Sequence, residues 1–151
     1  MKANTRLFGE IDIEDSKIIK LKEGIIGFPQ LKNFTLIHDE EKEGKGNIKW
    51  LQSMDDPSFA LPVINPLDVK QDYRLVVSEE NLKPLGNMTD ENTFILVTIT
   101  VPEKIEQMSV NLKAPFIVNT DNLEGAQIIV EDDYPVKYKI YDILNEKKAG
   151  E

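Results

Sequence analysis

The chain has 151 residues, with 18 basic and 27 acidic side chains and a formal net charge of −9 at pH 7. Because nucleic-acid affinity comes largely from Lys and Arg contacts with phosphates, this balance argues against a direct DNA- or RNA-binding protein and favours a basic protein partner, although acidity also serves solubility alone. No cysteine is present, which excludes disulfide scaffolds, Cys-ligated zinc, iron–sulfur clusters and thiol nucleophiles.

One domain is the expectation for this length, because about 150 residues can bury a sufficient core without disulfides or a metal. We expect a single β domain over residues 1–145 and a charged tail over residues 146–151, which has too little apolar content to pack. The N-terminal segment lacks the apolar run of a signal peptide, and no stretch of about 18 apolar residues occurs. These features favour a cytoplasmic location without a membrane span.

Short runs rich in β-branched and aromatic residues recur along the chain, with Gly, Pro, Asn and Asp between them. This spacing is typical of an antiparallel β-sandwich or barrel. The charged stretch 40–47 predicts a hairpin loop. The expected strands cover residues 5–8, 17–21, 34–38, 48–54, 59–64, 73–77, 94–101, 108–112, 116–119, 127–130 and 136–143.

The one clear helical signal covers residues 78–82. Ser78 can accept hydrogen bonds from the first N–H groups of a helix, and the acidic residues after it suit the positive end of the helix. Pro84 and Gly86 follow, so we expect a helix of one or two turns. The predicted fold class is therefore all-β, a small antiparallel β barrel or sandwich with one or two short helices.

The run FILVTITV at residues 94–101 has apolar residues on both faces of the expected strand. Such a run is typical of a central strand covered on each side, or of a barrel strand with an apolar interior and a packed exterior. We therefore assign four of its side chains to the core, namely Phe94, Leu96, Val97 and Ile99.

Catalytic or metal-binding chemistry has little support. His38 is the only histidine, and a single imidazole is a poor basis for a transition-metal site or a Ser-His-Asp triad. Asp55 and Asp56 form a carboxylate pair that a hydrolase could use, but adjacent residues of an extended segment point to opposite faces, and Asp-Asp-Pro is also typical of a turn. A turn, a partner-facing surface and a carboxylate-dependent hydrolase stay open as alternatives, and no cofactor is expected.

The segment WLQSMDDP at residues 50–57 is the first candidate for a protein-binding surface. It holds the only tryptophan, Trp50, which is more often a core residue than a recognition residue. Gln52 shares its face by strand alternation, which indicates a partly exposed or edge position.

The segment VNLKAPF at residues 110–116 is the second candidate. Pro115 interrupts an apolar run and cannot donate to a ladder, so the segment belongs at a sheet edge, a bulge or a strand switch. Asn111 and Lys113 fall on one face by alternation, where they can contact a partner or simply cap a bulge and protect an edge.

The chain resembles the flagellar assembly factor FliW family in the order of its motifs. They are G-I-I-G-F at 24–28, W-L-Q-S at 50–53 with D-D-P at 55–57, P-x-x-V-x-x-D-Y at 66–73, V-N-L-K-A-P at 110–115 and G-x-Q-I-I at 125–129. The resemblance spans the chain. Ile26 is a departure, because the family's turn is expected to carry proline there.

The resemblance implies a small barrel-like antiparallel β domain and a non-enzymatic cytoplasmic regulator. Such a regulator binds flagellin before export and, when flagellin is scarce, binds the basic RNA-binding translational repressor CsrA, with a leaning toward a non-competitive mode. We place the partner surface around the two segments above, with nearby acids adding to the field that attracts a basic partner. The expected partner-binding residues are Trp50, Gln52, Asp55, Asp56, Asn111, Lys113, Pro115, Phe116, Asp132 and Asp133.

Overall fold

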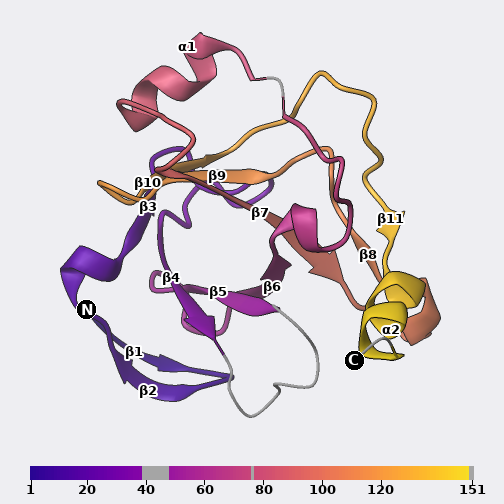
Figure 1. Cartoon of the computed structure of the whole chain (residues 1–151). Coiled ribbons are helices and arrows are strands. Elements are labelled where there is room, and N and C mark those ends of the chain that lie inside the picture. Colours follow the sequence, from indigo (N-terminus) through magenta and orange to yellow (C-terminus); the bar gives the residue numbers. More distant parts are fainter. Residues whose placement is uncertain (39–47, 76, 150–151) are drawn as a thin grey trace.

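The computed structural model describes residues 1–38, 48–75 and 77–149 (Figure 1). The expected hairpin loop at 40–47 lies outside the described residues. Within them, seven strands close into a barrel and only two short α-helices occur, so the predicted all-β class is confirmed. The barrel strands are β3 (Ile19–Leu21), β4 (Asn33–His38), β5 (Lys49–Ser53), β6 (Ala60–Ile64), β7 (Thr93–Thr100), β9 (Phe116–Asn119) and β10 (Glu124–Gln127).

The barrel closes because β7 pairs with β9 and β10 pairs with β3. Neighbouring barrel strands are antiparallel, except that β3 and β10 run parallel. The register of this parallel ladder pairs Lys20 with Glu124 and Leu21 with Gly125. Since β10 continues to Gln127, its last residues extend past the end of β3.

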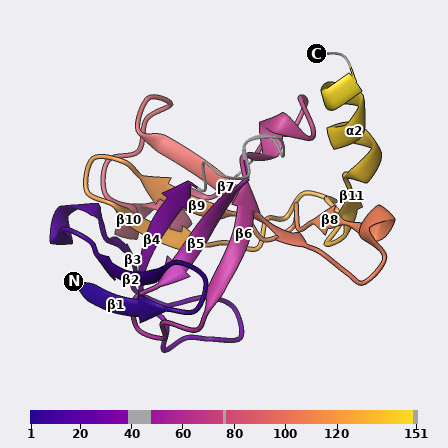
Figure 2. The same ribbon diagram turned by 90° about the horizontal axis from the view of Figure 1, so that it is seen from below.

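Further elements lie on either side of the barrel. β1 (Lys2–Thr5) and β2 (Gly9–Asp12) form a separate antiparallel hairpin, whereas β8 (Ser109–Val110) and β11 (Tyr138–Lys139) extend the sheet from β7. Figures 1 and 2 show the hairpin and α2 (Tyr141–Ala149) on opposite sides of the barrel. The 3-10 helices are η1 (Asp15–Lys17), η3 (Pro66–Asp68), η4 (Lys83–Leu85) and η5 (Ile105–Gln107).

The first helix, α1 (Glu79–Leu82), begins where the sequence predicts it. The Ser78 hydroxyl accepts a hydrogen bond from the N–H of Asn81 at 3.4 Å, and Glu79 and Glu80 occupy the first turn. None of the helices in the described part of the chain is long and apolar enough to cross a membrane.

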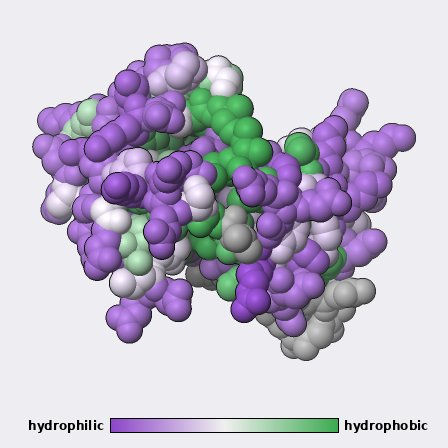
Figure 3. Space-filling model, turned by 90° about the horizontal axis from the view of Figure 1, so that it is seen from above, coloured by the Kyte–Doolittle hydropathy of each residue, from purple (hydrophilic) through white to green (hydrophobic). Residues whose placement is uncertain are grey.

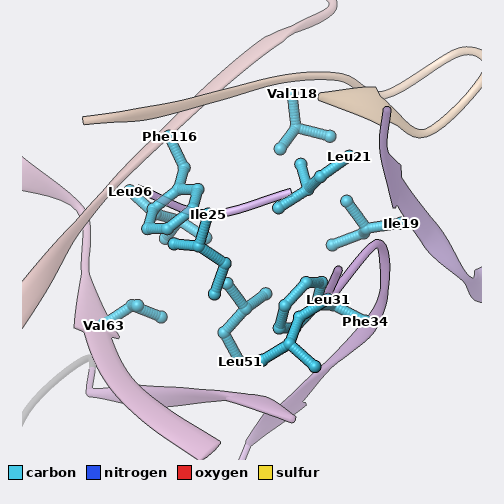
Figure 4. Packing of buried hydrophobic residues seen from close by; sticks show 10 residues of the cluster. All are labelled: Ile19, Leu21, Ile25, Leu31, Phe34, Leu51, Val63, Leu96, Phe116 and Val118. Atoms are coloured by element: carbon cyan, nitrogen blue, oxygen red, sulfur yellow. The ribbon is translucent and has the colours of Figure 1, made fainter. Parts of the chain in front are cut away.

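Ten buried apolar side chains, most of them from the surrounding strands, fill the barrel (Figure 4). Two of them, Ile25 and Leu31, come from the connection between β3 and β4 and are 5% and 4% exposed. This connection therefore contributes to the core as well as linking two strands. The whole cluster consists of Ile19, Leu21, Ile25, Leu31, Phe34, Leu51, Val63, Leu96, Phe116 and Val118.

Strand β7 has both faces covered, as its apolar run predicts. Leu96 lies in the barrel core, with Phe94 half-buried against it, while Val97 and Ile99 belong to a second cluster with β8 and Ile140. Leu96, Val97 and Ile99 are buried, which confirms them as core residues.

A further apolar cluster lies outside the barrel, where η4 contacts β9 and the residues after β10. Its buried members are Leu85, Ile117 and Ile128. Figure 3 views the molecule from the side on which α1 lies and shows a band of hydrophobic residues between hydrophilic ones. Apolar surface on this side is thus only partly covered.

The strand expected at 5–8 is wrong beyond its first residue, because Thr5 ends β1 and residues 6–8 form the turn between β1 and β2. The Thr5 hydroxyl accepts a hydrogen bond from the Phe8 N–H at 2.9 Å and donates one to the Gly9 carbonyl at 2.8 Å. A threonine that bonds to nearby backbone in this way stabilises a turn rather than a ladder.

The strand expected at 73–77 is also absent from its described residues, 73–75 and 77. Side chains hold this segment instead: the Tyr73 hydroxyl donates to the Leu112 carbonyl at 2.7 Å, and the Arg74 N–H donates to the Tyr134 hydroxyl at 3.0 Å. The apolar residues at 73, 75 and 77 therefore pack into the hydrophobic clusters on the two sides of this segment without forming a strand.

The strand expected at 136–143 shrinks to β11, and α2 begins at Tyr141. The Leu144 N–H donates to the carbonyl of Ile140, which is fully buried and anchors the start of the helix. Leu, Glu, Lys and Ala, which follow, are good helix formers. Local propensity thus overrides the alternation that the strand prediction relied on.

Candidate interaction surface

The connection between β3 and β4 contains a tight turn with apolar side chains on both sides. Gly24 has φ +69°, and a Cβ there would lie 2.5 Å from the Pro29 carbonyl oxygen, so glycine is required. Ile25 and Phe28 exchange backbone hydrogen bonds of 3.2 and 2.8 Å. Ile25 is buried, whereas Ile26 and Phe28 are 53% and 44% exposed. The turn therefore presents an isoleucine and a phenylalanine to solvent.

Gln127, at the end of β10, fastens this turn to the VNLKAP segment. Its Oε1 accepts a hydrogen bond from the Ile26 N–H at 2.8 Å, and its Nε2 donates to the Ala114 carbonyl at 3.1 Å. A proline at position 26 would have no N–H to donate. The isoleucine found there thus allows one side chain to link three segments.

Asn111 and Lys113 lie in a turn, because β8 ends at Val110. Asn111 Oδ1 accepts hydrogen bonds from the N–H groups of Lys113 and Ala114 at 3.0 and 3.1 Å. Lys113 Nζ donates to the Asp132 carbonyl at 2.7 Å. The expectation that Asn111 and Lys113 share a strand face is therefore wrong, and both side chains are half-buried.

Pro115 and Phe116, both named above as expected partner-binding residues, are buried. Phe116 begins β9 and points into the barrel core. Pro115 is covered by the segment after β10, in which the Ile128 N–H donates to the Pro115 carbonyl at 3.0 Å. The strand expected at 127–130 is wrong except at Gln127, because β10 runs from Glu124 to Gln127.

Asp55 and Asp56 form a turn in which the two carboxylates have different partners. Asp55 accepts hydrogen bonds from the N–H groups of Lys32 and Asn33 at 2.7 and 2.8 Å, and from the Asn33 amide at 3.0 Å. Asp56 accepts from the N–H and hydroxyl of Ser58 at 3.1 and 2.7 Å. Partial burial acts to raise the pKa of Asp55, but the hydrogen bonds from Asn33 and Lys32 outweigh it and lower the pKa below its ordinary value.

This arrangement gives no support to the hydrolase alternative. Hydrolysis by a carboxyl pair needs an acid with a raised pKa and a second carboxylate across the substrate. The pKa of Asp55 is shifted the other way, and Asp56 is turned toward Ser58. Among the residues that the structure describes, no group of three or more His, Asp or Glu side chains could hold a metal ion.

Trp50 and Gln52 share a face of β5, as alternation predicts, but their surroundings differ. Gln52 is 1% exposed and its Nε2 donates to three backbone carbonyls between Ser53 and Phe59. The expectation that Gln52 is partly exposed is therefore wrong, because the following turn folds over it. Trp50 is half-buried, and its ring meets Phe8 of the β1–β2 hairpin edge-on at 6.3 Å.

The two segments predicted to bind a partner, residues 50–57 and 110–116, lie on opposite sides of the Gly24 turn. The Phe28 ring lies 5.0 Å from that of Phe59, which follows the Asp-Asp-Pro turn. On the other side, Gln127 connects Ile26 to the 110–115 segment. We call the combined area the turn surface; its members are the exposed Ile26, Phe28, Asp56, Ile129 and Asp133 and the half-buried Asn111, Lys113 and Asp132.

Sequence reasoning missed three exposed apolar members of this surface, Ile26, Phe28 and Ile129. Two signals could have found them. Consecutive isoleucines between two glycines cannot both face the core, and apolar residues at 128–130 next to the acids at 131–133 cannot all be buried by alternation.

Comparison with known proteins agrees with this fold. Residues 2–140 match the family described as FliW protein. The flagellar assembly factors FliW of Lachnospira eligens and Lachnoclostridium phytofermentans are each 45% identical; the alignments cover 98% and 97% of this chain, and 99% and 95% of theirs. A crystal structure of the flagellar assembly factor FliW superimposes with a TM-score of 0.85 at 25% identity, covering 93% of this chain and 97% of that one. The chain therefore belongs to the FliW family of flagellar assembly factors.

Proposed function

We propose that the chain is a non-enzymatic regulator in the cytoplasm that binds flagellin before export and, when flagellin is depleted, binds and antagonises the translational repressor CsrA. Both partners then draw on one limited pool of the chain. Export of flagellin releases the chain to act on the repressor, which links flagellin synthesis to secretion. Membership in a family of flagellar assembly factors supports the flagellar role.

The observation that carries the proposal is the chemistry of the turn surface. Exposed apolar patches rimmed by polar residues are typical of protein-binding sites. Ile26, Phe28 and Ile129 offer contacts for apolar flagellin segments that are poorly ordered before assembly. Asp132 and Asp133, in a chain of net charge −9, favour fast association with a basic repressor.

The same charge supports antagonism of the repressor. A bound chain of net charge −9 repels the phosphates of an approaching RNA. This repulsion acts whether the chain covers the RNA site or changes the repressor's shape. The predicted contact residues that reach the surface at least in part are Trp50, Asp55, Asp56, Asn111, Lys113, Asp132 and Asp133.

The test is to mix the purified chain with flagellin and with CsrA and to measure the size of each complex by light scattering after gel filtration. We expect a stable complex with each partner, and release of CsrA from the chain when flagellin is added. Ile26→Asp should weaken both complexes. Leu67→Asp is the matched control, because Leu67 is 51% exposed in η3, away from the turn surface. Absence of a complex with both partners would contradict the proposal.

A further inference from the structure

We propose that the outer edge of the segment following β10, centred on Ile129, accepts an extended segment of the basic partner as an added β-strand. The identity of that partner, the repressor, rests on the proposed function. The edge itself is a feature of the fold. The segment that fits it carries a branched apolar side chain flanked by Lys or Arg.

The direction of the backbone groups around Ile129 defines the edge. The N–H groups of Ile128 and Val130 donate to the carbonyls of Pro115 and Lys113 at 3.0 and 2.9 Å. In an extended segment, the N–H and C=O of successive residues point to opposite edges. Those of Ile129 therefore point away from Pro115, and within the described residues no backbone hydrogen bond uses them.

The edge is open because the neighbouring strand ends too early. β3 stops at Leu21, and Gly24, with φ +69°, turns the chain away from β10. Beyond that point the Gln127 side chain, rather than a strand, bonds to the Ile26 N–H. A chain that enters beside Ile129 thus meets no backbone ladder that it must displace.

The side chains along this edge are apolar and exposed. Ile129 is 62% exposed, the highest value among the large hydrophobic residues that the structure describes, and Ile26 is 53% exposed. Proteins usually protect such edges with lysine, proline or a covering element, because an open apolar edge invites pairing with another chain. An isoleucine with unpaired backbone groups is instead the combination that strand addition uses.

Charge identifies the occupant as the basic partner. The segments that border the edge, residues 22–26 and 127–133, contain four carboxylates against one lysine, Lys22. Lys113 lies on the opposite side of this segment, where its Nζ donates to the Asp132 carbonyl. The carboxylates are Glu23, Glu131, Asp132 and Asp133, so a segment with Lys or Arg beside its apolar residue is complementary.

Amide hydrogen exchange, followed residue by residue by NMR, tests the edge on the unmodified chain. In the free chain, the Ile128 and Val130 amides should exchange slowly and the Ile129 amide quickly. Saturating CsrA should slow exchange at Ile129 by at least about tenfold, whereas saturating flagellin should leave it within about twofold. Protection by flagellin alone would overturn the choice of partner.

Variants separate the backbone contribution from the side-chain contribution. Ile129→Ala removes apolar contact and should weaken CsrA binding about fivefold to tenfold. Ile129→Pro also removes the N–H and should weaken it a further fivefold or so. Val101→Ala is the matched control, because Val101 is 58% exposed just after β7 and does not lie on this edge. The affinity of this variant for CsrA should stay within about twofold of the wild-type value.

The outcomes distinguish this inference from the proposed function. If the CsrA complex forms but the Ile129 amide still exchanges quickly, the strand-addition site is wrong while the proposed function stands. If neither CsrA nor flagellin binds the unmodified chain, the proposed function fails and this inference fails with it. Equal effects of Ile129→Ala and Ile129→Pro, with both variants folded, would refute the backbone contribution.

Discussion

Replacing Gly24 with alanine tests whether the turn is constrained by its backbone conformation alone or also by close contacts. Gly24 and Gly9 have nearly identical backbone angles, φ +69° and +68°. A Cβ on Gly9 would meet nothing within 4 Å, whereas one on Gly24 would lie 2.5 Å from the Pro29 carbonyl oxygen and 2.7 Å from that of Phe28. Gly9→Ala is therefore a control that carries only the conformational cost.

The left-handed conformation costs a non-glycine residue about 1–2 kcal/mol, so Gly9→Ala should lose about that much free energy of unfolding. Gly24→Ala should lose a further 1–3 kcal/mol or so, the usual cost of forcing an extra methyl group into a packed site. Urea denaturation followed by circular dichroism and by the fluorescence of Trp50 measures both variants. Losses that agree within about 0.5 kcal/mol would refute the contact, because the two glycines share nearly the same φ and differ in what an added Cβ would meet.

Three further predictions concern the core, the Asp-Asp-Pro turn and the acidic segment. Leu96→Ala should lose about 2–5 kcal/mol in the same urea assay, since Leu96 is 1% exposed; a loss below about 0.5 kcal/mol would mean that β7 is not central. Because hydrogen bonds lower the pKa of Asp55, its carboxylate contributes stability above the unfolded pKa of about 3.9, and that contribution is lost as pH falls through the folded pKa. The difference in stability between the wild type and Asp55→Asn should thus be constant near neutral pH and change in favour of Asp55→Asn as the pH falls below about 4, and a difference that does not depend on pH would contradict the hydrogen-bonding account. Reversing the charge at Asp132 and Asp133 should slow association with CsrA and flatten its salt dependence in stopped-flow measurements; an unchanged association rate would place the attractive field elsewhere.

The barrel was predictable where each strand carries its own signal. The run at 94–101 has apolar residues at successive positions, and only a strand covered on both faces accommodates them. The segments at 73–77 and 136–143 also carry apolar residues typical of strands, but the first is held by tyrosine hydroxyls and the second contains only the short β11 before α2 begins. The hydrophobic pattern predicts which side chains are buried, but it does not predict which part of the chain packs against them.

The candidate site was predictable at the level of segments but not of side chains. Pro115 correctly indicates an interrupted ladder, since it has no N–H to return to Ile128. Its burial, however, depends on the segment after β10, which packs beside it from a distant part of the sequence. Gln52 is buried for a similar reason, because the turn at 53–59 folds back over it. Exposure is set by such long-range packing, so alternation alone could not assign it.

The Gly24 turn couples the stability of the barrel to its proposed binding role. Ile25 packs inside the barrel and the adjacent Ile26 lies on the surface, so a change in the backbone of this turn moves a core residue and a contact residue together. A binding defect in Gly24→Ala therefore cannot separate lost contacts from a shifted core. Ile129 is the better probe, because its side chain is 62% exposed and, within the described residues, its backbone groups make no internal backbone hydrogen bond. Substitution there changes the surface while the packing that positions the turn stays in place.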